Sequence, residues 1–262
     1  MQQFREIINT NFQFKELNLN KSSKDSFVHN LKNNWAAYVD IPNLNEDDYI
    51  NLLQKLWKFK KETDSKIMEY FYKWILLNII TNKWENTNNT YQPFSTKSLN
   101  IHIENSLNPI DKIPNYLTLY CKKYSPEIRW GDTLIISMSD ILNEFKEKEL
   151  DILRTSKIKL NNWIELPNNI LVEDKKRKLE FLAFRDFWDY EKDWFIINSS
   201  ETKKEIKKVI YKLYELLYSK ENLKKIPWKV WSLYWIDNKK FLHLRTKQFE
   251  SWERHLQRLR II

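Results

Sequence analysis

The chain contains a single glycine, Gly131, among 262 residues. Loops that cradle phosphate need glycine, because other side chains block the close approach of the backbone to the phosphate oxygens. The Walker A loop, the dinucleotide-binding fingerprint and the glycine-rich loop of protein kinases each need more than one glycine. The sequence therefore excludes a fold built around a glycine-rich nucleotide site, although a site built from side chains stays open.

The rest of the composition is that of a folded protein. Hydrophobic residues make up 42% of the chain, charged residues 30% and aromatic residues 15%, and 12 residues are tryptophan. Disordered chains avoid aromatic residues, so most of this chain should fold, as one large domain or two small ones. Lysine, asparagine and isoleucine are plentiful whereas glycine and alanine are rare, which favours an AT-rich genome such as that of a virus, a plasmid or an organelle.

The sequence predicts no metal centre and no cofactor. Cys121 is the only cysteine, so an intramolecular disulfide is impossible, and we expect it to be a buried thiol within a strand. A zinc site needs several cysteine or histidine ligands close together. The histidines are His29, His102, His243 and His255, and none of them lies in a close ligand pair.

Two segments bear on where the protein acts. Residues 1–6 lack a basic region followed by an apolar run, so they predict no secretory signal. The most apolar stretch, residues 67–80, carries Glu69 and Lys73 and is shorter than the run of about 20 apolar residues that a membrane span needs. We therefore expect an intracellular protein, cytoplasmic or organellar and not secreted, with no membrane association.

The spacing of apolar residues predicts a mainly helical N-terminal portion over residues 1–114. Residues 12–19 alternate and predict a short strand. Helical spacing over 47–57 and again over 67–77 predicts a helical hairpin. Trp74 would be buried in this hairpin, and its replacement by alanine would then destabilise the fold by about 3–5 kcal/mol.

Residues 115–262 predict a mixed or antiparallel sheet with flanking helices. We expect strands at 117–120, 134–138, 179–184 and 194–197, and β-hairpins over 163–173 and 230–247. The clearest helix begins near Ser199 and carries an apolar stripe to Leu217. A last helix would carry Phe249, Trp252, Leu256 and Leu259 on one face. The predicted fold class is α+β, with the two portions as two domains or as one continuous domain.

Positive charge is concentrated at the C-terminal end. The formal net charge is +9, and residues 224–262 hold ten basic and three acidic residues, which leaves +7 in this segment. Four of the nine arginines lie after position 244, a clustering that an AT-rich genome does not explain. Because arginine binds phosphate through two parallel hydrogen bonds, the segment favours an anionic partner.

The predicted strand and helix of this segment would each turn a cationic face outward. On strand 241–247, His243, Arg245 and Lys247 share one face, and the last helix would expose Arg254 and Arg258. We therefore predict binding of nucleic acid, RNA or a single strand rather than a specific duplex, within a larger viral, plasmid or organelle assembly. The candidate contact residues are Lys239, Lys240, His243, Arg245, Lys247, Arg254, Arg258 and Arg260.

Three tryptophans interleave with this basic segment. Exposed aromatic side chains can stack on bases. Residues 230–236 are apolar on both faces, however, as a buried central strand would be. We therefore expect Trp228, Trp231 and Trp235 to pack in the core.

Two other functions stay open. The first is a non-enzymatic accessory or scaffold subunit that docks its basic C-terminus on an acidic protein. The second is a metal-dependent nuclease, because Glu165 and the run 173–175 (Glu-Asp-Lys) resemble the acid and Glu-x-Lys arrangement that holds Mg²⁺, and acids also crowd at 186–193. A chain with 35 acidic residues produces such spacings by chance, so we assign no catalytic residue and expect a binding protein rather than an enzyme.

Overall fold

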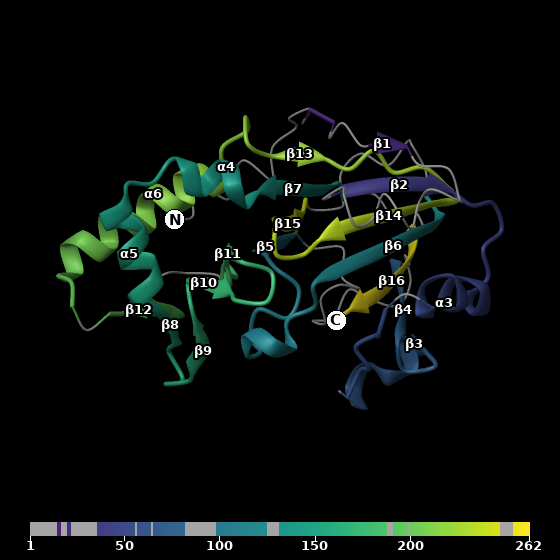
Figure 1. Ribbon diagram of the computed structural model, residues 1–262, viewed down its shortest axis with the longest axis horizontal. Coiled ribbons are helices and arrows are strands. Elements are labelled where there is room, and N and C mark those ends of the chain that lie inside the picture. The colour runs from purple at the N-terminus through teal and green to yellow at the C-terminus, as the bar shows by residue number, and fades with distance from the viewer. Residues whose placement is uncertain are drawn as a thin grey trace.

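The computed structural model describes residues 15–16, 20–21, 36–55, 57–63, 65–81, 98–124, 131–187, 191–198, 200–246 and 254–262. These residues form two facing β-sheets, with one helix on the outer face of the larger sheet and a layer of helices and small sheets beyond the other (Figure 1). None of the helices in these ranges is long and apolar enough to cross a membrane.

The larger sheet has seven strands in the order β1-β2-β14-β6-β16-β4-β3. The strands are β1 (Asn20–Lys21), β2 (Ala36–Asp40), β3 (Phe71–Tyr72), β4 (Leu76–Thr81), β6 (Tyr116–Lys123), β14 (Ser232–Asp237) and β16 (Arg254–Ile261). Helix α3 (Glu46–Gln54) covers the outer face of this sheet (Figure 1). There Tyr49 and Leu53 are buried in one cluster with Trp235 and Leu259.

The smaller sheet has four strands in the order β13-β7-β15-β5. They are β13 (Lys224–Lys225), β7 (Thr133–Ser137), β15 (Phe241–Arg245) and β5 (Leu99–His102). The two sheets pack through a shared apolar cluster, in which Ile135 and Phe241 of the smaller sheet meet Leu119 and Leu256 of the larger one. The chain crosses from one sheet to the other between β14 and β15, so these consecutive strands do not pair with each other.

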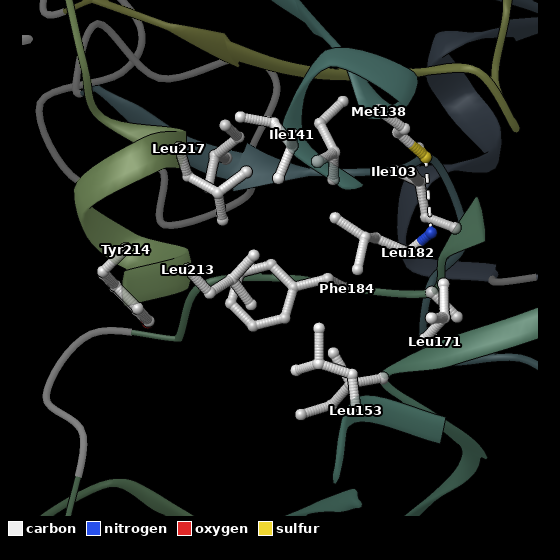
Figure 2. Packing of buried hydrophobic residues seen from close by; sticks show 14 of the residues in the cluster. Ile103, Met138, Ile141, Leu153, Leu171, Leu182, Phe184, Leu213, Tyr214 and Leu217 are labelled. Atoms are coloured by element: carbon white, nitrogen blue, oxygen red, sulfur yellow. Dashed lines mark hydrogen bonds between the residues drawn. The ribbon is translucent and has the colours of Figure 1, made fainter. Parts of the chain in front are cut away.

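A third layer covers the other face of the smaller sheet. It contains α4 (Met138–Asn143), α5 (Glu147–Thr155), α6 (Lys203–Leu217), the sheet of β8 (Lys157–Leu160), β9 (Glu165–Asn169) and β12 (Trp194–Ile197), and the pair β10 (Leu171–Asp174) and β11 (Leu179–Leu182). Figure 2 shows the largest apolar cluster among the described residues, with Phe184 beside Leu213 of α6, and with Ile103 just after β5. This cluster includes Ile101 and Ile103, the neighbours of a residue of the candidate site.

Several predicted elements are confirmed. Helix α6 begins after Thr202, whose hydroxyl accepts a hydrogen bond from the backbone N–H of Glu205 while the Glu205 carboxylate accepts one from Thr202. The predicted stripe faces the core, with Ile206 and Leu213 buried. The strands predicted at 117–120, 134–138, 179–184 and 194–197 correspond to β6, β7, β11 and β12.

The predicted α+β fold with a helical N-terminal portion is wrong, because the described chain is mostly β-sheet and begins with strands. The first predicted helix exists as α3, but the second is replaced by a short 3₁₀ helix (Ser65–Tyr70) and by β3 and β4. Lys73 and Trp74 have positive φ angles of 49° and 64°, which no α-helix accommodates. The run Leu76–Thr81 is a strand, and apolar periodicity alone does not distinguish a short buried strand from a buried helix.

The C-terminal helix and both predicted hairpins are also wrong. Residues Arg254–Ile261 form β16, which lies between β6 and β4 in the middle of the larger sheet. Leu256 and Leu259 therefore point to opposite faces of that sheet, one into each flanking cluster. Strand β9 pairs with β8 and strand β10 with β11, so the predicted 163–173 hairpin does not form. The predicted strand at 12–19 and residues 249 and 252 lie outside the described residues, apart from 15–16.

Candidate metal centre

Three side chains with metal-binding atoms meet at the edge of the smaller sheet. His102 ends β5, Glu104 follows two residues later, and His243 lies on β15. Strands β5 and β15 are antiparallel, and their register places His243 directly opposite His102. The two rings are 4.2 Å apart between centroids, and one donor atom from each of the three side chains lies within 4.8 Å of the others.

Alternation along the chain explains this placement. Ile103 is fully buried in the core cluster beneath the smaller sheet (Figure 2), so its neighbours His102 and Glu104 face the other way, toward the larger sheet. Asn238 holds the turn that carries Glu104, because its side-chain oxygen accepts a hydrogen bond from the Glu104 N–H (2.9 Å) and its amide nitrogen donates to the Glu104 carbonyl (3.2 Å). The backbone at Glu104 is thus held in place by the Asn238 side chain.

Both histidines are neutral at physiological pH. The Nδ1 of His102 lies 2.7 Å from the carbonyl oxygen of Asn100 and must donate its proton there, which leaves the Nε2 lone pair for another partner. Burial lowers the pKa of His102 well below its ordinary value, and the neighbouring His243 contributes. Burial also lowers the pKa of His243 to about 4. The buried Nδ1 of His243 has no hydrogen-bond partner within the described part of the chain.

Glu104 is a buried carboxylate that is held in its charged form. Burial opposes the charge, but the guanidinium groups of Arg258 and Arg260 outweigh burial and lower the pKa of Glu104. Arg258 Nη1 lies 2.8 Å from Glu104 Oε2, and Arg260 Nη1 lies 3.7 Å from Oε1. Both arginines come from β16, so the three metal-binding side chains lie between the two sheets.

This set of donors suits a divalent transition metal. Two neutral imidazoles and one carboxylate, all from one side of a site, are the donors of the facial triad that binds iron(II) in non-haem oxygenases and leaves coordination positions open. The observations on this chain that favour a metal are the close approach of three donors and the unpartnered, buried ring nitrogen of His243. The residues present therefore fit a bound iron(II).

Two cavities adjoin the metal-binding side chains. The larger has a volume of about 530 Å³, and its lining includes His102, Glu104 and Arg258. The smaller has a volume of about 70 Å³ and lies between the sheets, where it is bordered by His102, His243 and Arg258. A ligand of the metal could therefore reach into either cavity.

Buried and half-buried arginines line the smaller cavity. Arg245 comes from β15, whereas Arg254 and Arg258 come from β16 on the facing sheet. Burial, together with the like charge of Arg254, lowers the pKa of Arg245 to about 9. Arg254 donates to the carbonyl oxygen of Gly131 (2.9 Å), but the Nε atoms of Arg254 and Arg258 are buried without a partner among the described residues. Clustered and incompletely hydrogen-bonded guanidinium groups favour an anionic ligand.

The basic residues predicted to form an exposed surface do not do so. Lys239 is buried in an ion pair with Asp174 (2.7 Å), and Arg260 is buried against Glu62 (2.7 Å). Lys240 is half-buried, and Lys247 lies outside the described residues. The remaining four candidates, His243, Arg245, Arg254 and Arg258, border the smaller cavity.

The carboxylates considered for a nuclease are held elsewhere. Glu165 pairs with Lys157 (2.9 Å), and Asp174 pairs with Lys239. Asp186 is buried and accepts hydrogen bonds from the hydroxyl groups of Tyr214 (2.5 Å) and Tyr218 (2.6 Å). Glu173 is exposed and Asp189 lies outside the described residues. Glu104 was not among the candidate residues predicted from the sequence, although it forms a His-x-Glu triplet with His102 that is visible there.

Cys121 is fully buried on β6, as predicted, and burial raises the pKa of its thiol to about 12. Because the thiolate is the reactive form, the folded protein should resist iodoacetamide at pH 8. We expect no carboxamidomethylation of the native protein and stoichiometric modification in urea, measured by intact mass. Rapid modification of the native protein would contradict the burial of β6.

The comparisons with known proteins agree with this geometry. Residues 74–260, most of the chain, match the family described as taurine catabolism dioxygenase TauD, TfdA family. A search of curated proteins finds no sequence match. Among solved structures, PvcB from Pseudomonas aeruginosa aligns with a TM-score of 0.70 at 12% identity, over 91% of this chain and 79% of PvcB.

Two further structures show the same fold. A taurine dioxygenase from Burkholderia xenovorans aligns with a TM-score of 0.61 at 12% identity, over 96% of this chain and 91% of that one. An asparagine oxygenase in complex with Fe(II), 3-hydroxyasparagine and succinate aligns with a TM-score of 0.63 at 13% identity, over 91% of this chain and 77% of that one. The two facing sheets are thus the double-stranded β-helix of these proteins.

These findings overturn the predictions of a nucleic-acid-binding protein, an accessory subunit of a viral, plasmid or organelle assembly, or a nuclease. They also overturn the expectation that the chain is not an enzyme and that it has a nucleic-acid partner. The match over most of the sequence and the shared fold lead to one conclusion. The chain belongs to the TauD/TfdA family.

Proposed function

We propose that this chain is an iron- and α-ketoglutarate-dependent oxygenase that acts on a small molecule. The observation that carries the proposal is the convergence of His102, Glu104 and His243 between the sheets. Family membership supports it, as does the fold shared with PvcB, which is described as an Fe, α-ketoglutarate dependent oxygenase. The single glycine excludes a glycine-rich nucleotide site, and an oxygenase of this kind does not need one.

The chain's own residues would hold the iron and prepare its surroundings. His102 and His243 are neutral because they are buried, and Glu104 is ionised because of its arginines, so all three present lone pairs without first losing a proton. When bound, iron(II) would couple the reaction of O₂ with α-ketoglutarate, giving succinate and CO₂, to insertion of the second oxygen atom into a C–H bond of the substrate. Asn100 and Asn238 would fix the orientation of His102 and Glu104.

The smaller cavity is the proposed site for one carboxylate of α-ketoglutarate. α-Ketoglutarate is a dianion, and the cavity offers guanidinium groups from both sheets. Arg258 contacts the metal-binding Glu104, whereas Arg254 donates to the carbonyl of Gly131. A carboxylate bound between Arg245 and Arg254 would relieve the repulsion of two buried like charges.

Replacing Arg254 with methionine should raise the KM for α-ketoglutarate by about tenfold or more, because a charge-assisted hydrogen bond to a carboxylate contributes about 1.5–3 kcal/mol. The kcat at saturating α-ketoglutarate should fall less than the KM rises, since Arg254 does not touch the metal-binding side chains. Succinate formation at varied α-ketoglutarate measures both constants. Arg154→Met, which removes a surface arginine paired with Glu180, is the matched control. An unchanged KM in Arg254→Met would place the co-substrate elsewhere.

The proposed function is tested by anaerobic titration of the purified protein with Fe(II) or Co(II), followed by exposure to O₂ and α-ketoglutarate. We expect one metal ion per chain and slow, metal-dependent release of succinate even without the primary substrate. Absence of metal binding would reject the proposal at its first step. Metal binding without succinate, over a range of α-ketoglutarate concentrations, would reject the assigned co-substrate.

We also propose that the protein is intracellular. Iron(II) is easily oxidised, and the reducing interior of the cell keeps both thiols and ferrous iron reduced. Cell fractionation with an antibody against the chain tests this location, and recovery of the protein from the medium would contradict it.

A further inference from the structure

The turn at 238–240 lies beside two of the three metal-binding residues. It connects β14 of the larger sheet with β15 of the smaller sheet. Asn238, at its start, is fully buried and forms hydrogen bonds with the backbone N–H and the backbone carbonyl of Glu104. Strand β15 follows the turn, and its third residue is His243. The position of this turn therefore sets the positions of Glu104 and His243 together.

Two ion pairs hold the residues on either side of Asn238. The guanidinium group of Arg177 donates to both carboxylate oxygens of Asp237, at 3.0 and 2.5 Å. The ammonium group of Lys239 lies 2.7 Å from a carboxylate oxygen of Asp174. Asp174 and Arg177 both belong to the hairpin of β10 and β11. We refer to these four charged residues as the double ion pair, which joins this hairpin to the crossing between the two sheets.

The double ion pair is largely withdrawn from solvent. The side chains of Asp237 and Lys239 are 3% and 5% exposed, and that of Asp174 is 10% exposed. Burial opposes the charge of Asp174, but the hydrogen bond from Lys239 helps to outweigh burial and lowers the pKa of Asp174. The transfer of charged groups out of water is so costly that apolar side chains of similar volume often stabilise a fold equally well. Stability alone therefore does not account for two buried ion pairs at this place.

The ion pairs supply a defined geometry. A guanidinium group that binds both oxygens of one carboxylate fixes the direction of the contact as well as its length. Each carboxylate also caps its own turn. Asp237 Oδ1 accepts a hydrogen bond from the backbone N–H of Lys239 (3.0 Å). Asp174 Oδ1 accepts hydrogen bonds from the backbone N–H groups of Lys176 (3.1 Å) and Arg177 (3.2 Å). The ion pairs therefore join two turns that are each already fixed by their own hydrogen bonds.

We infer that the double ion pair positions the metal-binding residues, because it holds Asn238 in place and thereby keeps Glu104 close to His243. This inference rests on the proposed function, since it assumes that a metal ion binds at His102, Glu104 and His243. The four residues of the double ion pair are not themselves among these donors, so their effect passes through Asn238 and through the start of β15. Loss of the double ion pair should therefore weaken metal binding in a protein that still folds.

A variant without the double ion pair tests this inference. It carries Asp174→Asn, Arg177→Met, Asp237→Asn and Lys239→Met. The two asparagines keep the oxygen that caps each turn, and the loss of all four charges leaves no buried charge of the double ion pair without its partner. We expect the affinity for Co(II) to fall by about tenfold or more, because loss of an outer partner of a metal ligand costs about 10–100-fold. Anaerobic titration followed by the visible absorption of bound Co(II) measures this affinity.

Two control variants separate positioning from general stability. Arg154→Met/Glu180→Gln removes a partly exposed ion pair between α5 and the same hairpin (2.7 Å) and should bind Co(II) like the parent. Ile206→Ala truncates a buried side chain of α6 and should lower the stability to urea without changing the affinity for Co(II). The affinity for Co(II) should thus depend on the double ion pair and not on stability.

Parent-like affinity in the four-residue variant would overturn the inference, and so would a tenfold loss of affinity in Ile206→Ala. Should the four-residue variant fail to fold, two double variants that each keep one ion pair carry the same test. They are Asp174→Asn/Lys239→Met and Arg177→Met/Asp237→Asn. Each should bind Co(II) more weakly than the parent, and parent-like binding by both would overturn the inference. Failure of the parent to bind Co(II) would instead reject the proposed function.

Discussion

Replacing His102 with alanine should reduce the affinity for iron(II) or cobalt(II) by about 100-fold or more, because loss of even an outer partner of a metal ligand costs about 10–100-fold. Succinate formation should fall to the background level. The reason is geometric, since His102 supplies one of only three protein donors that meet within 4.8 Å. Cobalt(II) absorption in the visible range reports metal binding directly, independently of turnover.

His255→Ala is the matched control. His255 is a half-buried histidine on β16, whose ring nitrogen lies 3.0 Å from the side-chain oxygen of Asn78, and it does not belong to the triad. The variant should bind metal like the parent. Glu104→Gln tests the carboxylate with little change of shape, although it leaves Arg258 and Arg260 without their shared buried anion, as Glu104→Ala would. Normal cobalt binding by His102→Ala would reject the assigned triad.

The elements that were predicted correctly are those whose pattern of apolar residues fits only one kind of secondary structure. Helix α6 has a capping residue, an acid three positions later and a stripe on one face, and these local signals agree with one another. Strands β6 and β7 read as short, uninterrupted apolar runs. In each case the tertiary structure buries the face that the local sequence marks as apolar.

The larger sheet was predicted only in part, because the segments that form its strands β4 and β16 were predicted to be helices. In β16, Leu256 and Leu259 have the spacing of one helical face, yet they enter the two clusters on opposite sides of the sheet. Arg254, Arg258 and Arg260 alternate along β16 on the same face as Leu256, so the face that meets the smaller sheet carries charge. A strand that is buried on both faces and carries buried charges therefore resembles an amphipathic helix in sequence.

The basic C-terminal segment was predicted to be exposed, but most of its described candidate residues are buried. Arginine clustering suggested exposure, since charged side chains are rarely buried without partners. The partners exist, but Glu62, Glu104 and Asp174 lie far away in sequence and meet the basic residues only through the pairing of strands. For the same reason His243 was assigned to a cationic face, because its relation to His102 depends on the register of β5 and β15.

The tryptophans give the sharpest test of the corrected fold. Trp228 and Trp235 are buried as predicted, whereas Trp231 is 37% exposed and Trp74 is 62% exposed. Trp74, expected to lie inside a helical hairpin, sits at a positive φ angle between two short strands. We therefore expect the large loss of stability when the buried Trp235 is replaced, and not when Trp74 is replaced.

Trp235→Ala should destabilise the protein by about 3–5 kcal/mol, the usual cost of truncating a buried tryptophan, whereas Trp74→Ala should change stability by about 0.5 kcal/mol or less. Trp235 is 1% exposed on β14, where its ring stacks on Tyr116 with centroids 4.4 Å apart and also contacts Trp57 at 5.0 Å. Removing it would leave a cavity between α3 and the larger sheet that these neighbours cannot fill. Urea unfolding followed by far-ultraviolet circular dichroism compares the two variants on the same scale. Equal losses of stability in the two variants would contradict the burial of Trp235 in the larger sheet. A larger loss in Trp74→Ala would favour the predicted helical hairpin.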